Sequence, residues 1–136
     1  QCLKAGAEFA LSPTNPDGMI AKCHAAGLLA VPGVANMAEL DAALTEGAHL
    51  AKLFPSTDWS PGQLIGVASP WMPVGGVTEA SIWPWLDAGA WCVGMGTHLC
   101  GSDLDEGARY AGWDDVNEEY RARGIFMELQ RRRNDA

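Results

Sequence analysis

The stretch "TEGAHLAKLFP" (residues 45–55) contains the pattern that decides the fold. A glycine typical of a helix end leads into a short apolar run, and Pro55 stops that run. Such a run, closed by a turn residue, predicts a buried strand. Lys52 stands inside it, where an unpaired ammonium would cost on the order of several kcal/mol. Its side chain therefore either reaches the surface or has a lowered pKa that makes it a neutral nucleophile.

The same phrase recurs along the chain. Each copy has glycine or another small residue, four or five apolar residues, and then proline or glycine: "KAGAEFALSP" from Lys4, "AAGLLAVPGV" from Ala25, "ASPWMPVGGV" from Ala68 and "DAGAWCVGMG" from Asp87. Because helical patterns separate these apolar runs, they predict an α/β fold with a parallel sheet covered on both faces. Two architectures fit, an open doubly wound sheet or part of a (β/α)8 barrel with about five β/α units in this chain.

Three helical patterns and a longer closing helix complete the predicted elements. The segment "NPDGMIAKCHAAG" is the first, "NMAELDAALTEG" has Asn36 and Glu39 as a capping pair, and "TEASIWPWLDAG" has Thr78 as its N-cap. The closing helix is expected at about residues 114–133, after an acidic segment that reads as a solvated loop. A single domain over residues 1–136 is expected from the length.

Charge, hydropathy and cysteine spacing limit the classes of function that the chain can have. A formal net charge of −8 argues against a nucleic-acid partner, and the apolar stretches are too short to cross a membrane. The 4 cysteines lack zinc-type spacing, so no metal is expected and the thiols are expected to be reduced. The chain begins with Gln1 rather than Met, so it is either processed or a piece of something longer. We expect a cytoplasmic protein, or one in an organelle stroma or matrix if it is processed.

The turns that follow the predicted strands carry the candidate chemistry. In "VGGVT", Gly75 and Gly76 present backbone N–H groups at a predicted helix N-terminus, and "GMGT" supplies Gly96 and Thr97. Glycine-rich loops after the last two strands are where barrels commonly bind phosphate. A lysine among apolar walls, such as Lys52, can condense with a carbonyl. The pattern therefore predicts a Schiff-base enzyme that acts on a phosphorylated keto compound.

The motifs "AKLFPS", "MPVGGVTEASIWPWLDAGAWCVGMGTHL" and "FALSP…VPGV" resemble the class I 2-keto-3-deoxy-6-phosphogluconate (KDPG) and 2-keto-3-deoxy-6-phosphogalactonate (KDPGal) aldolases, from about Ala5 to Leu104. The resemblance implies a (β/α)8 barrel, usually trimeric. Such enzymes cleave a 2-keto-3-deoxy-6-phospho sugar acid to pyruvate and glyceraldehyde 3-phosphate without a metal or other cofactor. Lys52 would be the Schiff-base lysine.

The resemblance also assigns roles to other residues. Val74 stands where gluconate-type enzymes generally carry threonine, which favours the galactonate type. The residues that match the phosphate loops are Gly75, Gly76, Gly96 and Thr97, and those that match the pocket lining are Pro32 and Phe54.

In this family, five units of this kind are the fourth to the eighth. The first three strands, with a proton-shuttling glutamate and a substrate-binding arginine, would precede Gln1, and no residue here maps to either. Open sheet edges and an exposed barrel interior then predict a homo-oligomer, a trimer by resemblance, or completion by another chain. The alternative function is an aldolase-derived, catalytically incomplete structural or interaction subunit. Trp59 and Trp113, in loop contexts, are better interface candidates than Trp91.

Overall fold

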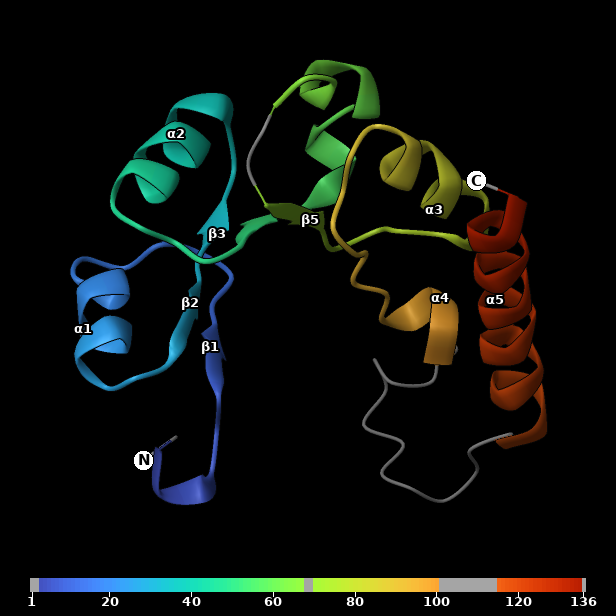
Figure 1. The fold of residues 1–136 in the computed structure, drawn as a ribbon, viewed down its shortest axis with the longest axis horizontal. Helices are drawn as coiled ribbons and strands as arrows, with labels where there is room; N and C mark the ends of the chain where they lie inside the picture. Colours follow the sequence, from blue (N-terminus) through green and yellow to red (C-terminus); the bar gives the residue numbers. More distant parts are fainter. Residues whose placement is uncertain (1–2, 68–69, 101–114, 136) are drawn as a thin grey trace.

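The structure, a computed structural model, describes residues 3–67, 70–100 and 115–135. Its elements follow one another around an arc, with helices α1, α2 and α3 on the outer side of the strands (Figure 1). A short 3-10 helix, η1 (Leu3–Ala5), precedes the first strand. Strands and helices alternate along most of the chain, as the repeated sequence phrase predicts.

Every strand pairing among the described residues is parallel. Strand β1 (Phe9–Leu11) pairs with β2 (Leu29–Val31), and a second sheet has the order β3 (Gly33–Val34), β4 (Ala51–Leu53), β5 (Trp71–Pro73). Pro32 separates β2 from β3, since proline has no N–H to donate to a ladder. Neighbours in space are also neighbours in sequence, which is the order of a barrel and lacks the reversal of a doubly wound sheet.

Five complete units are not confirmed. The fifth predicted strand is reduced to one bridge between Val74 and Gly94. Between β4 and β5 the structure has two 3-10 helices, η2 (Ser56–Asp58) and η3 (Pro61–Leu64), in place of an α-helix. Pro55 and Pro61 lie only a few residues apart, and each removes a donor that a longer helix would need.

Two of the helices begin where their capping residues predict. Helix α1 (Met19–Ala25) is followed by α2 (Met37–Thr45), where the Asn36 side chain accepts the Glu39 N–H at 3.0 Å. Helix α3 (Glu79–Asp87) begins after Thr78, whose hydroxyl accepts the Ser81 N–H at 3.3 Å. Both predicted caps are confirmed.

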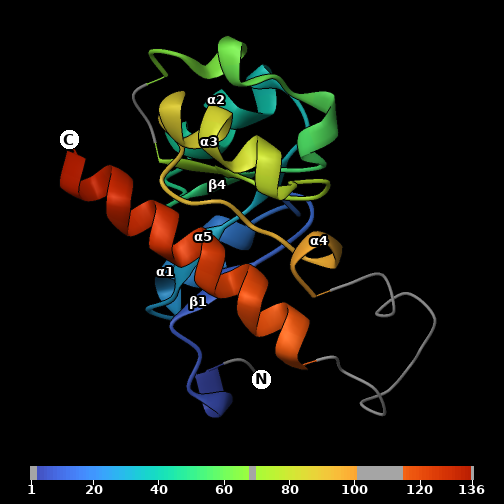
Figure 2. The same cartoon turned by 90° about the vertical axis from the view of Figure 1, so that its right-hand side faces the viewer.

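Two further helices follow α3. Helix α4 (Thr97–Cys100) is short, and α5 (Asp115–Asp135) corresponds to the predicted closing helix. Residues 101–114, with Trp113 and most of the acidic segment, lie outside the described residues. Figure 2 shows α5 passing in front of the strands. Its Arg132 guanidinium lies 4.3 Å from the Trp83 ring centroid and 3.4 Å from the Asp87 carboxylate, which joins α5 to α3.

The core fills the space between the strands and helices α1 to α3. Alternate residues of β4, Ala51 and Leu53, are fully buried in it, together with side chains from the helices and from β5: Ile20, Cys23, Leu40, Ala43, Trp71 and Trp85. The opposite, inner face of the strands is partly open. There Phe9 is 57% exposed and its strand partner Leu29 is 49% exposed.

The tryptophan prediction is wrong for the two described residues. Trp59, expected at an interface, is buried in the core, whereas Trp91 is 73% exposed. Trp59 is the residue that ends η2, and it belongs to the core cluster, so its loop context did not imply exposure. Among the described helices, none has both the length and the apolar character to cross a membrane.

Candidate functional site

Lys52 occupies the centre of β4 and lies between two neighbouring strands. Its register partners are Gly33 in β3 and Met72 in β5, and its N–H donates to the Pro32 carbonyl at 2.9 Å. Successive side chains of a strand point to opposite faces. Since Ala51 and Leu53 belong to the helix-side core, the Lys52 side chain lies on the inner face.

The surroundings of the Lys52 amine disfavour its charged form. The residue is only 6% exposed, and among the described residues no carboxylate forms an ion pair with it. Desolvation by burial lowers the pKa of the Lys52 ammonium below its ordinary value. The Phe54 ring, whose centroid is 4.1 Å from Nζ, supplies the one favourable electrostatic contact described for this ammonium. A lowered pKa increases the fraction of neutral amine, which is the nucleophilic form.

The two glycines after β5 are required by their contacts. Gly75 and Gly76 have φ angles of 84° and 82°, a region that L side chains rarely adopt. A Cβ at Gly75 would lie 2.9 Å from the Phe54 ring, and a Cβ at Gly76 would lie 2.6 Å from a Thr57 methyl. The loop therefore packs directly on the segment that follows Lys52.

The structure brings several predicted site residues together. Phe54 contacts both the Lys52 amine and the position of Gly75. Val74 pairs with Gly94, so the two glycine loops start from neighbouring backbone positions. These residues meet at the carboxyl ends of parallel strands, where barrels place their active sites.

Three other predicted residues lie at the edge of this group. Pro32 is fully buried and binds Lys52 through its carbonyl, but the register places Gly33 opposite the lysine. Gly96 has open space around it, and Thr97 begins α4 with an exposed side chain. The roles of these residues, like those of the other predicted site residues, stay predictions.

Sequence reasoning missed two residues of the site. A Cβ at Gly33 would lie 2.1 Å from the Pro13 carbonyl oxygen, so only glycine fits where the loop after β1 crosses β3. Ser56 is buried and its hydroxyl donates to the Gly75 carbonyl at 2.6 Å. Pro32 before Gly33 signalled a turn, whereas a serine after proline carried no signal of a contact 19 residues away.

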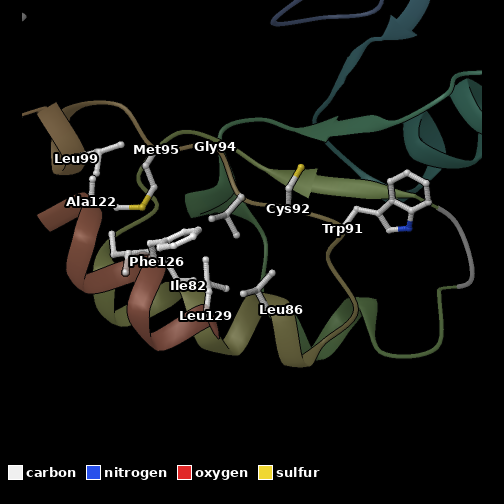
Figure 3. Close-up of a pocket in the computed structure, with 12 residues that line it drawn as sticks. Ile82, Leu86, Trp91, Cys92, Gly94, Met95, Leu99, Ala122, Phe126 and Leu129 are labelled. Atoms are coloured by element: carbon white, nitrogen blue, oxygen red, sulfur yellow. The ribbon is translucent and has the colours of Figure 1, made fainter. Parts of the chain in front are cut away.

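A separate apolar pocket of about 630 Å³ lies between α3, α5 and residues 91–95 (Figure 3). Phe126 of α5 points toward Ile82 of α3 and Met95. The lining does not include Lys52, and its only titratable side chain is the Cys92 thiol, whose pKa is raised by burial. Such a lining cannot perform acid–base or imine chemistry, so we place the candidate site at Lys52 and not in this pocket.

The two histidines outside the turns have structural contacts. His49 accepts the Ala30 N–H at 3.1 Å, and its ring lies edge-on to His24 with centroids 5.0 Å apart. Within the described ranges, no group of three or more His, Cys, Asp or Glu side chains gathers as metal ligands do. The expectation that the chemistry needs no metal or cofactor stays a prediction.

The arrangement defines a class of protein. Parallel strands in chain order, a buried inner-face lysine and glycine loops at the strand ends are typical of TIM-barrel enzymes that form a Schiff base. The sequence profile of the KDPG and KHG aldolase family matches residues 1–116. The chain belongs to this family of carbon–carbon lyases, as the sequence motifs predicted.

One relative agrees with this assignment in sequence, and two solved structures share the fold. The 2-dehydro-3-deoxy-6-phosphogalactonate aldolase of Escherichia coli (strain K12) is 30% identical over an alignment of 117 residues, and the match covers 79% of this chain and 57% of that protein. The native KDPGal structure superposes with a TM-score of 0.73 at 24% identity, covering 98% of this chain and 63% of the other. The KDPG aldolase of Legionella pneumophila, solved with pyruvate captured as a covalent carbinolamine, gives a TM-score of 0.65 at 24% identity and covers 76% of this chain and 53% of that one. The chain thus spans less than two thirds of the length of each.

Proposed function

We propose that this chain carries the Schiff-base site of an aldolase that cleaves a 2-keto-3-deoxy-6-phospho sugar acid to pyruvate and glyceraldehyde 3-phosphate. The observation that carries the proposal is the burial of Lys52, without an ion-pair partner among the described residues, at the inner face of a parallel strand. Carrying a lone ammonium there destabilises the fold, so a chemical use of the amine explains its presence.

The proposed reaction is that of a neutral amine with the carbonyl group of a 2-keto acid. Neutral Nζ of Lys52 attacks the C2 carbonyl, and the resulting carbinolamine loses water to form an iminium ion. A base takes the proton of the C4 hydroxyl, that oxygen forms the aldehyde carbonyl, and the electron pair of the breaking C3–C4 bond moves to the iminium, which releases glyceraldehyde 3-phosphate and leaves an enamine. Protonation of the enamine and hydrolysis then release pyruvate and restore the amine. In the Legionella enzyme, pyruvate is captured as a covalent carbinolamine, which supports this route.

The phosphate is proposed to bind at the two glycine loops, through Gly75, Gly76, Gly96 and Thr97. Backbone N–H groups next to the N-terminus of α3 suit an anion, since the helix dipole is positive there. We propose the galactonate epimer as substrate. Val74 and the E. coli galactonate-type relative support that choice.

Proton transfer needs a group that the described contacts of Lys52 do not supply. Among the described residues no carboxylate pairs with this amine, and general acid–base catalysis typically contributes about a hundredfold or more. Phe9, Leu11 and Leu29 expose apolar surface on the inner face beside the free edge of β1. We propose that further polypeptide, in an oligomer such as a trimer or from another chain, covers this surface.

The same exposed surface favours one alternative function. An aldolase-derived subunit that is held in an assembly through its inner face would retain the fold and need no turnover. In that case Lys52 would be a buried structural lysine.

Borohydride trapping distinguishes the two functions. The folded protein is incubated with pyruvate and sodium borohydride, and the adduct is located by intact mass and peptide mapping. The chain has three lysines, and exposed Lys4 and Lys22 serve as internal controls. An adduct at Lys52 that forms faster than at the controls supports the aldolase. Equal or slower modification of Lys52 in folded protein refutes the imine site and favours the structural subunit.

A further inference from the structure

Ser56 makes its hydrogen bonds to one short piece of backbone. Its N–H donates to the carbonyls of Val74 and Gly75, at 2.8 Å and 3.1 Å, and its hydroxyl donates to the Gly75 carbonyl at 2.6 Å. The residue is buried at the start of η2, two residues after Phe54. These bonds join the segment after β4 to the loop after β5.

The Gly75 carbonyl shares a peptide unit with the Gly76 N–H. In a planar trans peptide the C=O and N–H bonds point in opposite directions, so fixing one fixes the other. Both glycines have positive φ angles, and glycine by itself restricts this backbone weakly. The two hydrogen bonds from Ser56 to the Gly75 carbonyl therefore determine where the Gly76 N–H points.

The Gly76 N–H is available to a ligand. Gly76 is exposed, and among the described residues its N–H donates to no backbone or side-chain acceptor. A carbonyl that accepts hydrogen bonds polarises its own peptide, which strengthens the N–H as a donor. Ser56 thus orients and strengthens a donor without itself reaching the solvent-facing side of the loop.

We propose that Ser56 is a positioning residue for phosphate binding, acting through the Gly75–Gly76 peptide. This inference rests on the proposed function of the loop, and it gives a role to a residue to which neither the motif resemblance nor the family assignment assigns one. It predicts that the Ser56 hydroxyl affects phosphate affinity and has no effect on the reactivity of Lys52.

The test compares Ser56→Ala with Ser60→Ala. Ser60 lies in the same connection, is exposed, and uses its hydroxyl in the capping box of η3, so its replacement removes the same atom away from the loop. Calorimetric titration with inorganic phosphate measures the Kd, and borohydride trapping with pyruvate measures the rate at Lys52. We expect the loss of one hydrogen bond to raise the phosphate Kd about fivefold in Ser56→Ala only, with trapping unchanged in both variants.

Each other outcome overturns the inference. An unchanged phosphate Kd in Ser56→Ala refutes the positioning role while the imine site stands. Parallel losses of phosphate binding and trapping indicate a general structural role for the serine. Trapping at Lys52 in wild-type protein without phosphate binding refutes the loop assignment, and absence of both refutes the proposed function itself.

A measurement on the wild-type protein covers the case in which Ser56→Ala does not fold. In a ¹H–¹⁵N NMR titration with inorganic phosphate, the Gly76 amide proton should move downfield more than the amides of Gly27 and Gly66, glycines in similar backbone conformation elsewhere. A Gly76 amide that does not respond contradicts the inference.

Discussion

Replacing Gly75 with alanine tests whether the glycine loop is packed on the lysine site. The substitution adds a Cβ at a residue with φ of 84°, 2.9 Å and 3.1 Å from two Phe54 ring carbons and 3.4 Å from the Pro55 Cα. A shift of the ring would also change its contact with the Lys52 amine, which lies 4.1 Å from the ring centroid. Either the loop or the ring must therefore shift.

Gly66→Ala is a matched control. Gly66 has a φ of 85°, and nothing lies within 4 Å of its hypothetical Cβ. Left-handed backbone costs an alanine about 1 kcal/mol relative to glycine at either position. Overpacking adds about 1–3 kcal/mol at Gly75 alone. We expect the free energy of unfolding to fall by about 1 kcal/mol in Gly66→Ala and by about 2–4 kcal/mol in Gly75→Ala.

Urea unfolding, followed by circular dichroism, measures these differences, and each kcal/mol should lower Tm by about 4 °C. Pyruvate trapping on the folded variants supplies the second readout, because displacement of Phe54 changes the surroundings of Lys52. Gly75→Ala should slow trapping and Gly66→Ala should not. Equal stabilities and equal trapping rates in the two variants would refute the packing of this loop on Phe54.

Three further predictions address the charge, the substrate and the fold. Lys52→Met removes a desolvated ammonium and should raise the free energy of unfolding at neutral pH. Because folding lowers the pKa of Lys52 in the wild type, the unfolded chain holds one more proton than the folded chain between the lowered pKa and about 10.4. The wild type therefore gains stability as the pH rises through that window, and the stability difference between the variant and the wild type shrinks. Urea unfolding of both proteins at pH 7 and pH 10 checks this, and a constant difference contradicts it. Val74→Thr adds a hydroxyl beside the two glycines. It should raise the ratio of kcat/KM for the gluconate substrate to kcat/KM for the galactonate substrate about fivefold, as measured by a coupled pyruvate assay on an active assembly that includes the further polypeptide. An unchanged ratio would show that Val74 does not determine specificity. Asn36→Ala removes the N-cap of α2 and should cost about 1 kcal/mol of stability by thermal unfolding, whereas Asn15→Ala, a residue outside the helices, should cost less.

Local sequence patterns were sufficient to predict much of the fold. Apolar runs closed by proline or glycine marked the strands at Phe9, Leu29, Ala51 and Trp71, and side chains at Asn36 and Thr78 marked two helix starts. Burial, alternation and capping act over a few residues, so they are visible in a sequence. Alternation then puts Lys52 on the inner face once the structure shows that Ala51 and Leu53 belong to the helix-side core.

Contacts between distant segments could not be predicted this way. Whether a tryptophan is buried depends on what packs against it, and for this reason Trp59 is buried and Trp91 is exposed, the reverse of what their sequence contexts predicted. The apolar run that predicted a fifth strand forms only one bridge, between Val74 and Gly94. Strand formation depends on pairing with a neighbouring strand as well as on an apolar run.

The sequence by itself determined the alternating parallel architecture, the lysine and the glycine loops, since each follows from a short run of residues. Only the tertiary structure decided how they meet. The Phe54 ring joins the Lys52 amine to Gly75, and Ser56 reaches the Gly75 carbonyl across 19 residues. Such contacts arise when strands align side by side, and their geometry depends on the whole arc of strands and helices.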